Sequence, residues 1–464
     1  MTAMLKHGPC LIMLAMGGSA FAQSIEAEQG LESRFQTLLG SEWTVSSQFL
    51  GDTGSSMTFS DVRLQRDEII VQITTLADFY EEGRVLGDNV SVHYGSLENF
   101  PLFDLDAFSL GGFGFAVDTL SEMNCADPSL ETAPDLVEFV GQRLLAQPDP
   151  SLRLPGSQAL GDLQAGSLGL TISMSRQSTG CVFTLSGTIE DLQVISGNDR
   201  LEISTFDVSS ALPTGDNEGQ SRFGISIASV FMGNAFQSYM FDNLEIEAAV
   251  PRQVVAAYLP KFYEEPEQET SLREIVFDQG AELTARLSGL DFNLNDFAPG
   301  NLTTDHLRGD MTMMGNIRPD GLEGTLSIQM PGAIEMQSNI RLRFTDNVME
   351  MSPIQASFVT SLEEFVFEFH SPAILEDIFW MTGWRVSDAI PQFLRQNMND
   401  LPLIGGSYEG EIDAIGEWIL AAEAGERVGV EALPGSPVNL GMVGGIFVLD
   451  VNTALSSMGF SASP

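Results

Sequence analysis

Large apolar residues recur at every second position in three stretches of the chain's second half, at 321–330, 339–344 and 365–369. A period of two is typical of a β-strand with one dry face and one wet face. The apolar positions are Leu322, Leu326, Ile328 and Met330, then Ile340, Leu342 and Phe344, then Phe365, Phe367 and Phe369. The segment therefore predicts neighbouring strands of a sheet.

The period changes directly after these strands. Ser371-Pro372 combines a capping hydroxyl with a proline at the first helical position, where no amide hydrogen bond is lost. Ile374, Leu375, Ile378 and Phe379 then recur at helical spacing. The segment up to Leu403 is predicted to form a pair of apolar helices, and one more helix is predicted around 414–422. The apolar run from Val438 to Leu449, interrupted by Asn439 and three glycines, is predicted to be one buried strand.

The first half repeats these patterns. It predicts a helix at 25–39 that stops at Gly40, a turn at 81–83, and a helix from Pro134 to Ala146. Strands are predicted at 69–73, 90–94, 168–174, 181–192, 201–208 and 223–227. Short strands in quick succession indicate an antiparallel meander. A strand followed by a helix is predicted at 241–261, in the same order as at 365–380. This similarity indicates that each half of the chain ends in a strand and a helix.

The chain is too long for one ordinary hydrophobic core. The charged, proline-bearing stretch 264–270 lacks apolar period and is predicted to be a linker. The expected domains are a β-rich N-terminal domain at 23–262 and a β-rich C-terminal domain with a helical hairpin at 271–464. The predicted fold class is α+β: an extensive antiparallel β-sheet in two sequential halves with packed helices.

Residues 1–22 have the features of a cleavable secretory signal. Lys6 supplies the basic start, an apolar run follows, and Ala20-Phe21-Ala22 is a small-x-small cleavage site. The apolar run is too short to span a bilayer, and the mature chain shows no later transmembrane segment. We therefore expect export to the periplasm. Cleavage leaves Cys125 and Cys181, for which a disulfide is the simplest expectation in an oxidising compartment.

The formal charge is −43, and removal of the signal, whose one charged residue is Lys6, leaves −44. So acidic a surface repels nucleic acid and anionic lipid headgroups, which excludes nucleic-acid binding. Two explanations stay open for the charge: solubility in a salty habitat, or binding of a cation or a basic partner such as another envelope protein.

Motifs for catalysis are missing. The three histidines beyond the signal are widely spaced, and the chain has no His-Glu-x-x-His, Cys-x-x-Cys or Gly-x-Ser-x-Gly. Acidic pairs such as Glu363-Glu364 are common by chance among 64 acidic residues, and no EF-hand loop is present. We therefore expect no catalytic residues, no metal site and no cofactor.

Strands with one apolar face, together with apolar helices, suggest a binding site for a lipid or another apolar ligand. The expected ligand-binding residues are Phe367, Ile378, Phe379 and Phe393, between the last strand and the helices that follow. Methionines cluster at Met311, Met313 and Met314. They fit adaptable packing and an adaptable binding site equally well.

The strand-to-helix segment from Phe365 to Leu403 and the C-terminal stretch Leu433-Pro434-Gly435-Ser436-Pro437-Val438 resemble exported alphaproteobacterial proteins of the DUF2125 and AsmA-like kind. AsmA-like proteins are implicated in outer-membrane lipid homeostasis, so the resemblance implies a periplasmic, lipid-related role. The chain departs from the AsmA pattern in having a cleavable signal instead of a retained anchor. The leading hypothesis is a non-enzymatic periplasmic protein that binds a lipid or other apolar ligand. The alternative is an envelope structural or interaction protein whose acidic surface binds a basic partner or cation.

Overall fold

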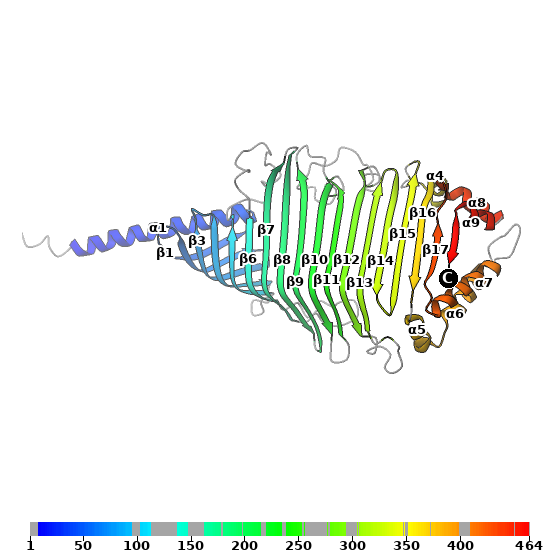
Figure 1. Ribbon diagram of the computed structural model, residues 1–464. Helices are drawn as coiled ribbons and strands as arrows, with labels where there is room; N and C mark the ends of the chain where they lie inside the picture. Colours follow the sequence, from blue (N-terminus) through cyan, green and yellow to red (C-terminus); the bar gives the residue numbers. More distant parts are fainter. Residues whose placement is uncertain are drawn as a thin grey trace, which may run out of the picture. The chain divides into compact units, whose positions relative to one another are not determined.

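The structure of the protein is a computed structural model (Figure 1). It describes residues 8–94, 103–112, 137–146, 162–177, 180–196, 198–214, 220–233, 238–252, 255, 276, 279–293, 304, 306–346, 348, 351–371, 373–398, 409–449 and 451–463.

The described chain is mostly β, with one antiparallel sheet of 19 strands and several helices. It divides into two compact units, 1–198 with 205–217, and 199–204 with 218–464. The predicted antiparallel meander is confirmed, because strands that follow one another in the chain pair side by side. Unit 1 contains α1 (Gly8–Leu39), β1 (Thr44–Asp52), β2 (Met57–Arg66), β3 (Ile69–Phe79), β4 (Arg84–Tyr94), β5 (Phe103–Gly111), β6 (Val137–Ala146), β7 (Asp162–Gln177) and β8 (Gly180–Ser196). Strand β9 (Asp199–Thr214) contributes residues to both units.

Unit 2 continues the meander and carries the remaining helices. Its strands are β10 (Gln220–Gly233), β11 (Ser238–Pro251), β12 (Ala281–Asn293), β13 (His306–Arg318), β14 (Gly321–Met330), β15 (Ile334–Phe344), β16 (Thr360–His370), β17 (Val428–Ala432), β18 (Val438–Asn439) and β19 (Phe460–Ser463). Its helices are α4 (Pro353–Val359), α5 (Ile374–Thr382), α6 (Val386–Met398), α7 (Glu409–Glu423), α8 (Leu440–Leu449) and α9 (Val451–Ser457). These helices gather around β16 to β19 (Figure 1).

The core of unit 1 lies between α1 and one face of the first strands. Leu31 and Phe35 on α1 are buried against Phe59, Val62 and other apolar side chains of β2 to β5. The predicted helix at 25–39 is confirmed, and it ends at Gly40, whose φ of 106° is left-handed and whose amide donates to the Gln36 carbonyl.

One buried ion pair joins α1 to the sheet. Arg34 donates from Nη1 to both carboxylate oxygens of Asp78 on β3, at 2.5 and 2.6 Å. Burial raises the pKa of Asp78, against the opposing charge and hydrogen bond of Arg34. A carboxylate this buried needs its cationic partner, so the pair fixes where α1 crosses β3.

Left-handed residues interrupt alternate strands from β2 to β12. In unit 1 these are Asp61 in β2, Asn89 in β4, Arg143 in β6 and Asp191 in β8, with φ between 51° and 53°. In unit 2, Ser229 in β10 and Gly289 in β12 have φ of 50° and 65°. Asn and Asp tolerate this conformation better than most residues.

In β2 and β4 the buried parity switches at the left-handed residue. Phe59 and Val62 in β2 are both buried in the same core although they lie three positions apart, on either side of Asp61. In a regular strand such residues would point to opposite faces. The switch explains why apolar residues of one sheet face change from odd to even numbers partway along a strand.

The predicted helix from Pro134 to Ala146 is wrong, because residues 137–146 form strand β6. Phe139 and Leu144 pair directly with Leu110 and Leu105 of β5. They belong to the same face because Arg143 switches the parity between them. The resulting odd spacing mimics helical periodicity.

The predicted strand from Val438 to Leu449 is also wrong. Only Val438–Asn439 is extended, and Leu440–Leu449 forms helix α8. The Asn439 side-chain oxygen accepts a hydrogen bond from the Met442 amide at 3.1 Å, which is the geometry of a helix N-cap. An apolar run alone does not distinguish a buried strand from a helix.

Several other predictions from the sequence can be compared with the described residues. The helix around 414–422 is confirmed within α7, and the helix after Ser371 is confirmed as α5. Its predicted start is wrong, because α5 begins at Ile374 with Ala373 at the N-cap and without a side-chain capping bond. The Ser371 hydroxyl accepts from the Leu375 amide at 3.3 Å, but Ser371 lies ahead of the cap position.

Pro372, the linker 264–270, Cys125 and most of the helix predicted after Pro251 lie outside the described residues. The pairing of Cys125 with Cys181 and the two sequential halves stay predictions. No described helix combines the length and the hydropathy needed to cross a membrane.

We predict that Leu31→Ala destabilises unit 1 by about 2–5 kcal/mol, because it leaves a cavity where a side chain only 1% exposed now packs. Urea unfolding followed by circular dichroism measures the change. Leu39→Ala, at the exposed end of the same helix, is the matched control and should cost under about 1 kcal/mol. Equal losses in both variants would show that α1 does not form the core.

Candidate functional site

Register places the apolar residues of β10 to β16 on one face of the sheet. Directly opposed residues of antiparallel strands share a face. Leu287 faces Leu244 of β11 and Met311 of β13, and Met311 in turn faces Ile328 of β14. We define the apolar face by these members: Ile225, Ile227, Leu244, Ile246, Leu283, Leu287, Met311, Met313, Leu322, Leu326, Ile328, Met336, Ile340, Leu342, Phe365, Phe367 and Phe369.

Among the residues that the structure describes, no second layer seals the first strands of this face. Ile225 is 38% exposed, Leu283 39% and Met313 43%. The described helices of unit 2 make their main contacts with β16, β17, β18 and β19 instead. Isolated exposed apolar residues are ordinary, but a face on which they continue from strand to strand marks an interaction surface.

Helix α7 closes the apolar face at its β16 and β17 end. The Trp418 ring lies 6.3 Å from the ring of Phe367, centroid to centroid, and its indole N–H donates to the Gly429 carbonyl at 3.4 Å. Ile378 of α5 packs against the same cluster, which contains Leu375, Ala422 and Val428. Phe367 and Ile378, two of the expected ligand-binding residues, are therefore brought together as packing between helices and sheet.

The other two expected residues lie at the surface of the helices. Phe379 lines a cavity of about 300 Å³ between α5 and α7, and the Arg385 guanidinium lies 4.9 Å from the centre of its ring. Phe393 of α6 is 62% exposed. The most exposed members of the apolar face, Leu283 and Met313, are not among the four residues expected from the sequence, although the methionine cluster lies in that region.

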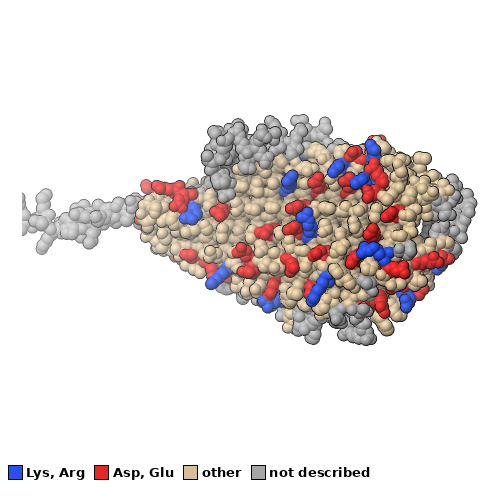
Figure 2. All heavy atoms as spheres, viewed as in Figure 1, with Lys and Arg blue, Asp and Glu red and all other residues tan. Residues whose placement is uncertain are grey.

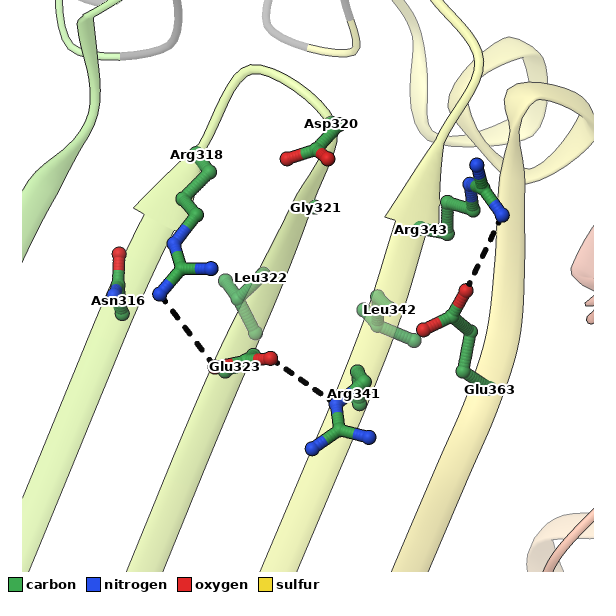
Figure 3. Close-up of a pocket in the computed structure, with 10 residues that line it drawn as sticks. All are labelled: Asn316, Arg318, Asp320, Gly321, Leu322, Glu323, Arg341, Leu342, Arg343 and Glu363. Carbon is green, nitrogen blue, oxygen red and sulfur yellow. Dashed lines mark hydrogen bonds and ion pairs between the residues drawn. The ribbon is translucent and has the colours of Figure 1, made fainter.

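The opposite face of unit 2 is polar and carries a ladder of ion pairs. Arginine and acidic side chains are interspersed over the side of the sheet seen in Figure 2. In a shallow cavity of about 130 Å³, Glu323 of β14 lies between Arg318 of β13 and Arg341 of β15, at 4.0 and 3.1 Å (Figure 3). Arg341 also reaches Glu364, and Arg343 reaches Glu363, at 3.3 and 3.7 Å. The adjacent acids of β16 are thus ion-pair partners of arginines on β15.

A second cluster on the polar face joins β12 and β13. Asp291 accepts from His306 at 2.6 Å and from Arg308 at 2.8 Å. Desolvation alone would raise the pKa of Asp291, but the hydrogen bonds and charges of His306 and Arg308 outweigh it and lower the pKa. The ionised carboxylate therefore stabilises the pairing of these strands.

Unit 1 brings a serine, a histidine and a carboxylate together. Ser91 Oγ lies 2.9 Å from Nε2 of the buried His93, and Asp104 of β5 is directly opposite Ser91. Burial raises the pKa of Asp104, although the charge of His93 opposes the shift. Nδ1 of His93 has no hydrogen-bond partner among the described residues, so no carboxylate orients the imidazole as a hydrolytic triad requires.

Within the described ranges, no group of three or more His, Cys, Asp or Glu side chains could hold a metal ion. The comparisons add no relative: no family model matches the sequence, and no curated protein matches it. The apolar face of unit 2, closed at one end by α7 and backed by a polar face, is the candidate site. The resemblance to DUF2125 and AsmA-like proteins stays a prediction.

We predict that Asp291→Asn lowers the free energy of unfolding by about 1 kcal/mol near neutral pH, because it removes a carboxylate from the Arg308 guanidinium and from its hydrogen bond with His306. A lowered folded-state pKa gives stability that is present above the unfolded value of 3.8 and lost as pH falls through the folded pKa. The gap between variant and wild type should therefore close below pH 3.8 in urea titrations at several pH values. Asp320→Asn, at an exposed turn, is the control. A gap that stays constant with pH would contradict the assignment.

Proposed function

We propose that this chain is a non-enzymatic periplasmic protein of the cell envelope that binds a lipid or another apolar ligand on the apolar face of unit 2. The observation that supports it most is the exposure of Ile225, Leu283 and Met313 in the middle of an otherwise continuous apolar surface. The signal-like N-terminus and the AsmA-like resemblance support the compartment and the lipid-related role. The expected arrangement in two sequential halves belongs to the same hypothesis.

The energetics favour a ligand on this face. Burial of apolar surface contributes about 25 cal/mol per Å², so a ligand that covers several half-exposed side chains gains several kcal/mol. Leu, Ile and Met side chains offer no hydrogen bonds, which suits acyl chains better than polar metabolites. Met311 and Met313 at the centre adapt to ligands of different shape.

The alternative role, binding of a basic partner or cation by the acidic surface, is favoured by the net charge of −43. Described acids on the polar face such as Glu323 and Glu364 already have arginine partners, which weakens this alternative there. It predicts salt-sensitive capture of a basic partner without any bound lipid.

The direct test is native mass spectrometry of the protein purified from its own periplasm, followed by solvent extraction and identification of bound lipids. Stoichiometric lipid is the expected result. Protein recovered empty, which also fails to take up a fluorescent fatty acid, would contradict the proposal.

Two adjacent methionines provide a matched pair of variants. Met313 and Met314 are 43% and 44% exposed, but Met313 lies on the apolar face and Met314 on the polar face, opposite Thr284 and Thr325. We predict that Met313→Glu weakens binding of a fluorescent fatty acid at least tenfold, because it places a charge beneath the chain. Met314→Glu should leave binding within about twofold, with unchanged circular dichroism for both. Equal effects would place the ligand elsewhere.

A further inference from the structure

Unit 1 contains a cavity of about 780 Å³ beside α1, within the size range of small-molecule sites. Its apolar lining comes from Leu31 on α1, Phe49 on β1 and Met57 on β2. The cavity does not involve the apolar face of unit 2, and it is independent of the function proposed above.

Gly30 of α1 lines this cavity at an exposed position of the helix. No heavy atom lies within 4 Å of the position that a Cβ at Gly30 would take. A glycine in the middle of a helix costs about 1 kcal/mol relative to alanine. A larger side chain at Gly30 would extend into the open space of the cavity.

The charged side chains that line the cavity carry a net negative charge. Arg34, the cationic side chain among the described lining residues, holds Asp78 at 2.5 Å. Glu26 and Asp52 add two further carboxylates. Partial desolvation and the charges of Asp52 and Glu81 raise the pKa of Tyr80, another lining residue. The potential in the cavity is therefore negative, which disfavours a fatty acid or a phosphate.

We propose that this cavity binds an amphipathic organic cation. The apolar stem of such a molecule lies against the partly buried Phe49 and Met57, and its positive head lies near Glu26 and Asp52. Apolar burial supplies most of the affinity, and the carboxylates select the sign of the head.

The test uses the full chain and two probes with the same tail, dodecyltrimethylammonium and dodecyl sulfate, below their micelle concentrations in isothermal titration calorimetry. The cation should bind at least tenfold more tightly than the anion. The double variant Glu26→Gln, Asp52→Asn should reduce that preference to within about threefold. An anion that binds as tightly as the cation to the wild type would overturn the proposal.

Gly30→Leu separates the cavity from other sites. Leucine fills the space and has the better helix propensity, so Tm should stay equal or rise while cation binding falls at least tenfold. Ser33→Leu adds the same side chain at an exposed position of α1 and should bind like the wild type. Met313→Glu should also retain cation binding, which distinguishes this cavity from the apolar face. Undiminished binding by Gly30→Leu would overturn the proposal.

Discussion

Direct cross-strand pairing is the constraint on which this structure depends. In an antiparallel meander, each residue must share a face with the residues opposite it on both neighbouring strands. A left-handed residue such as Asp61 changes the direction of every later side chain in its strand. The sheet keeps one apolar face only because the sequence changes parity at the same place, as Phe59 and Val62 do in β2 and Ile227 and Val230 do in β10.

A single sheet with one apolar face must cover that face or expose it. Unit 1 covers its first strands with α1, whose Leu31 and Phe35 reach the core and whose Arg34 meets the buried Asp78. Helix α1 also protects an edge, because the Glu28 carboxylate accepts from the Phe49 amide of β1. In the described part of unit 2, α7 and its Trp418 cover the β16 and β17 end of the apolar face. The difference between the units explains why Ile225, Leu283 and Met313 stay exposed.

Strands whose apolar and polar residues alternate without interruption can be predicted from the sequence. A strand in which the alternation changes parity can be predicted wrongly. Strands β14 and β15 contain no left-handed residue, and simple alternation identifies both. In β6, Arg143 shifts the apolar positions and creates a helical pattern, and no local signal marks arginine as left-handed. In α8, Asn439 interrupts an apolar strand pattern because it caps a helix. Capping chemistry is readable from sequence, but only once a helix is considered.

The candidate site is harder to predict because it depends on which parts of the apolar face other elements of the chain cover. Phe367, Ile378, Phe379 and Phe393 are large and apolar, yet Phe367 and Ile378 pack in the junction between helices and sheet. Met313 and Met314 have the same side chain and almost the same exposure, so neither residue type nor exposure separates them. Their neighbours do: Ala285 and Leu326 flank Met313, whereas Thr284 and Thr325 flank Met314. An apolar ligand gains from the first set and would desolvate hydroxyl groups in the second, so the register of three strands decides which methionine belongs to a binding face.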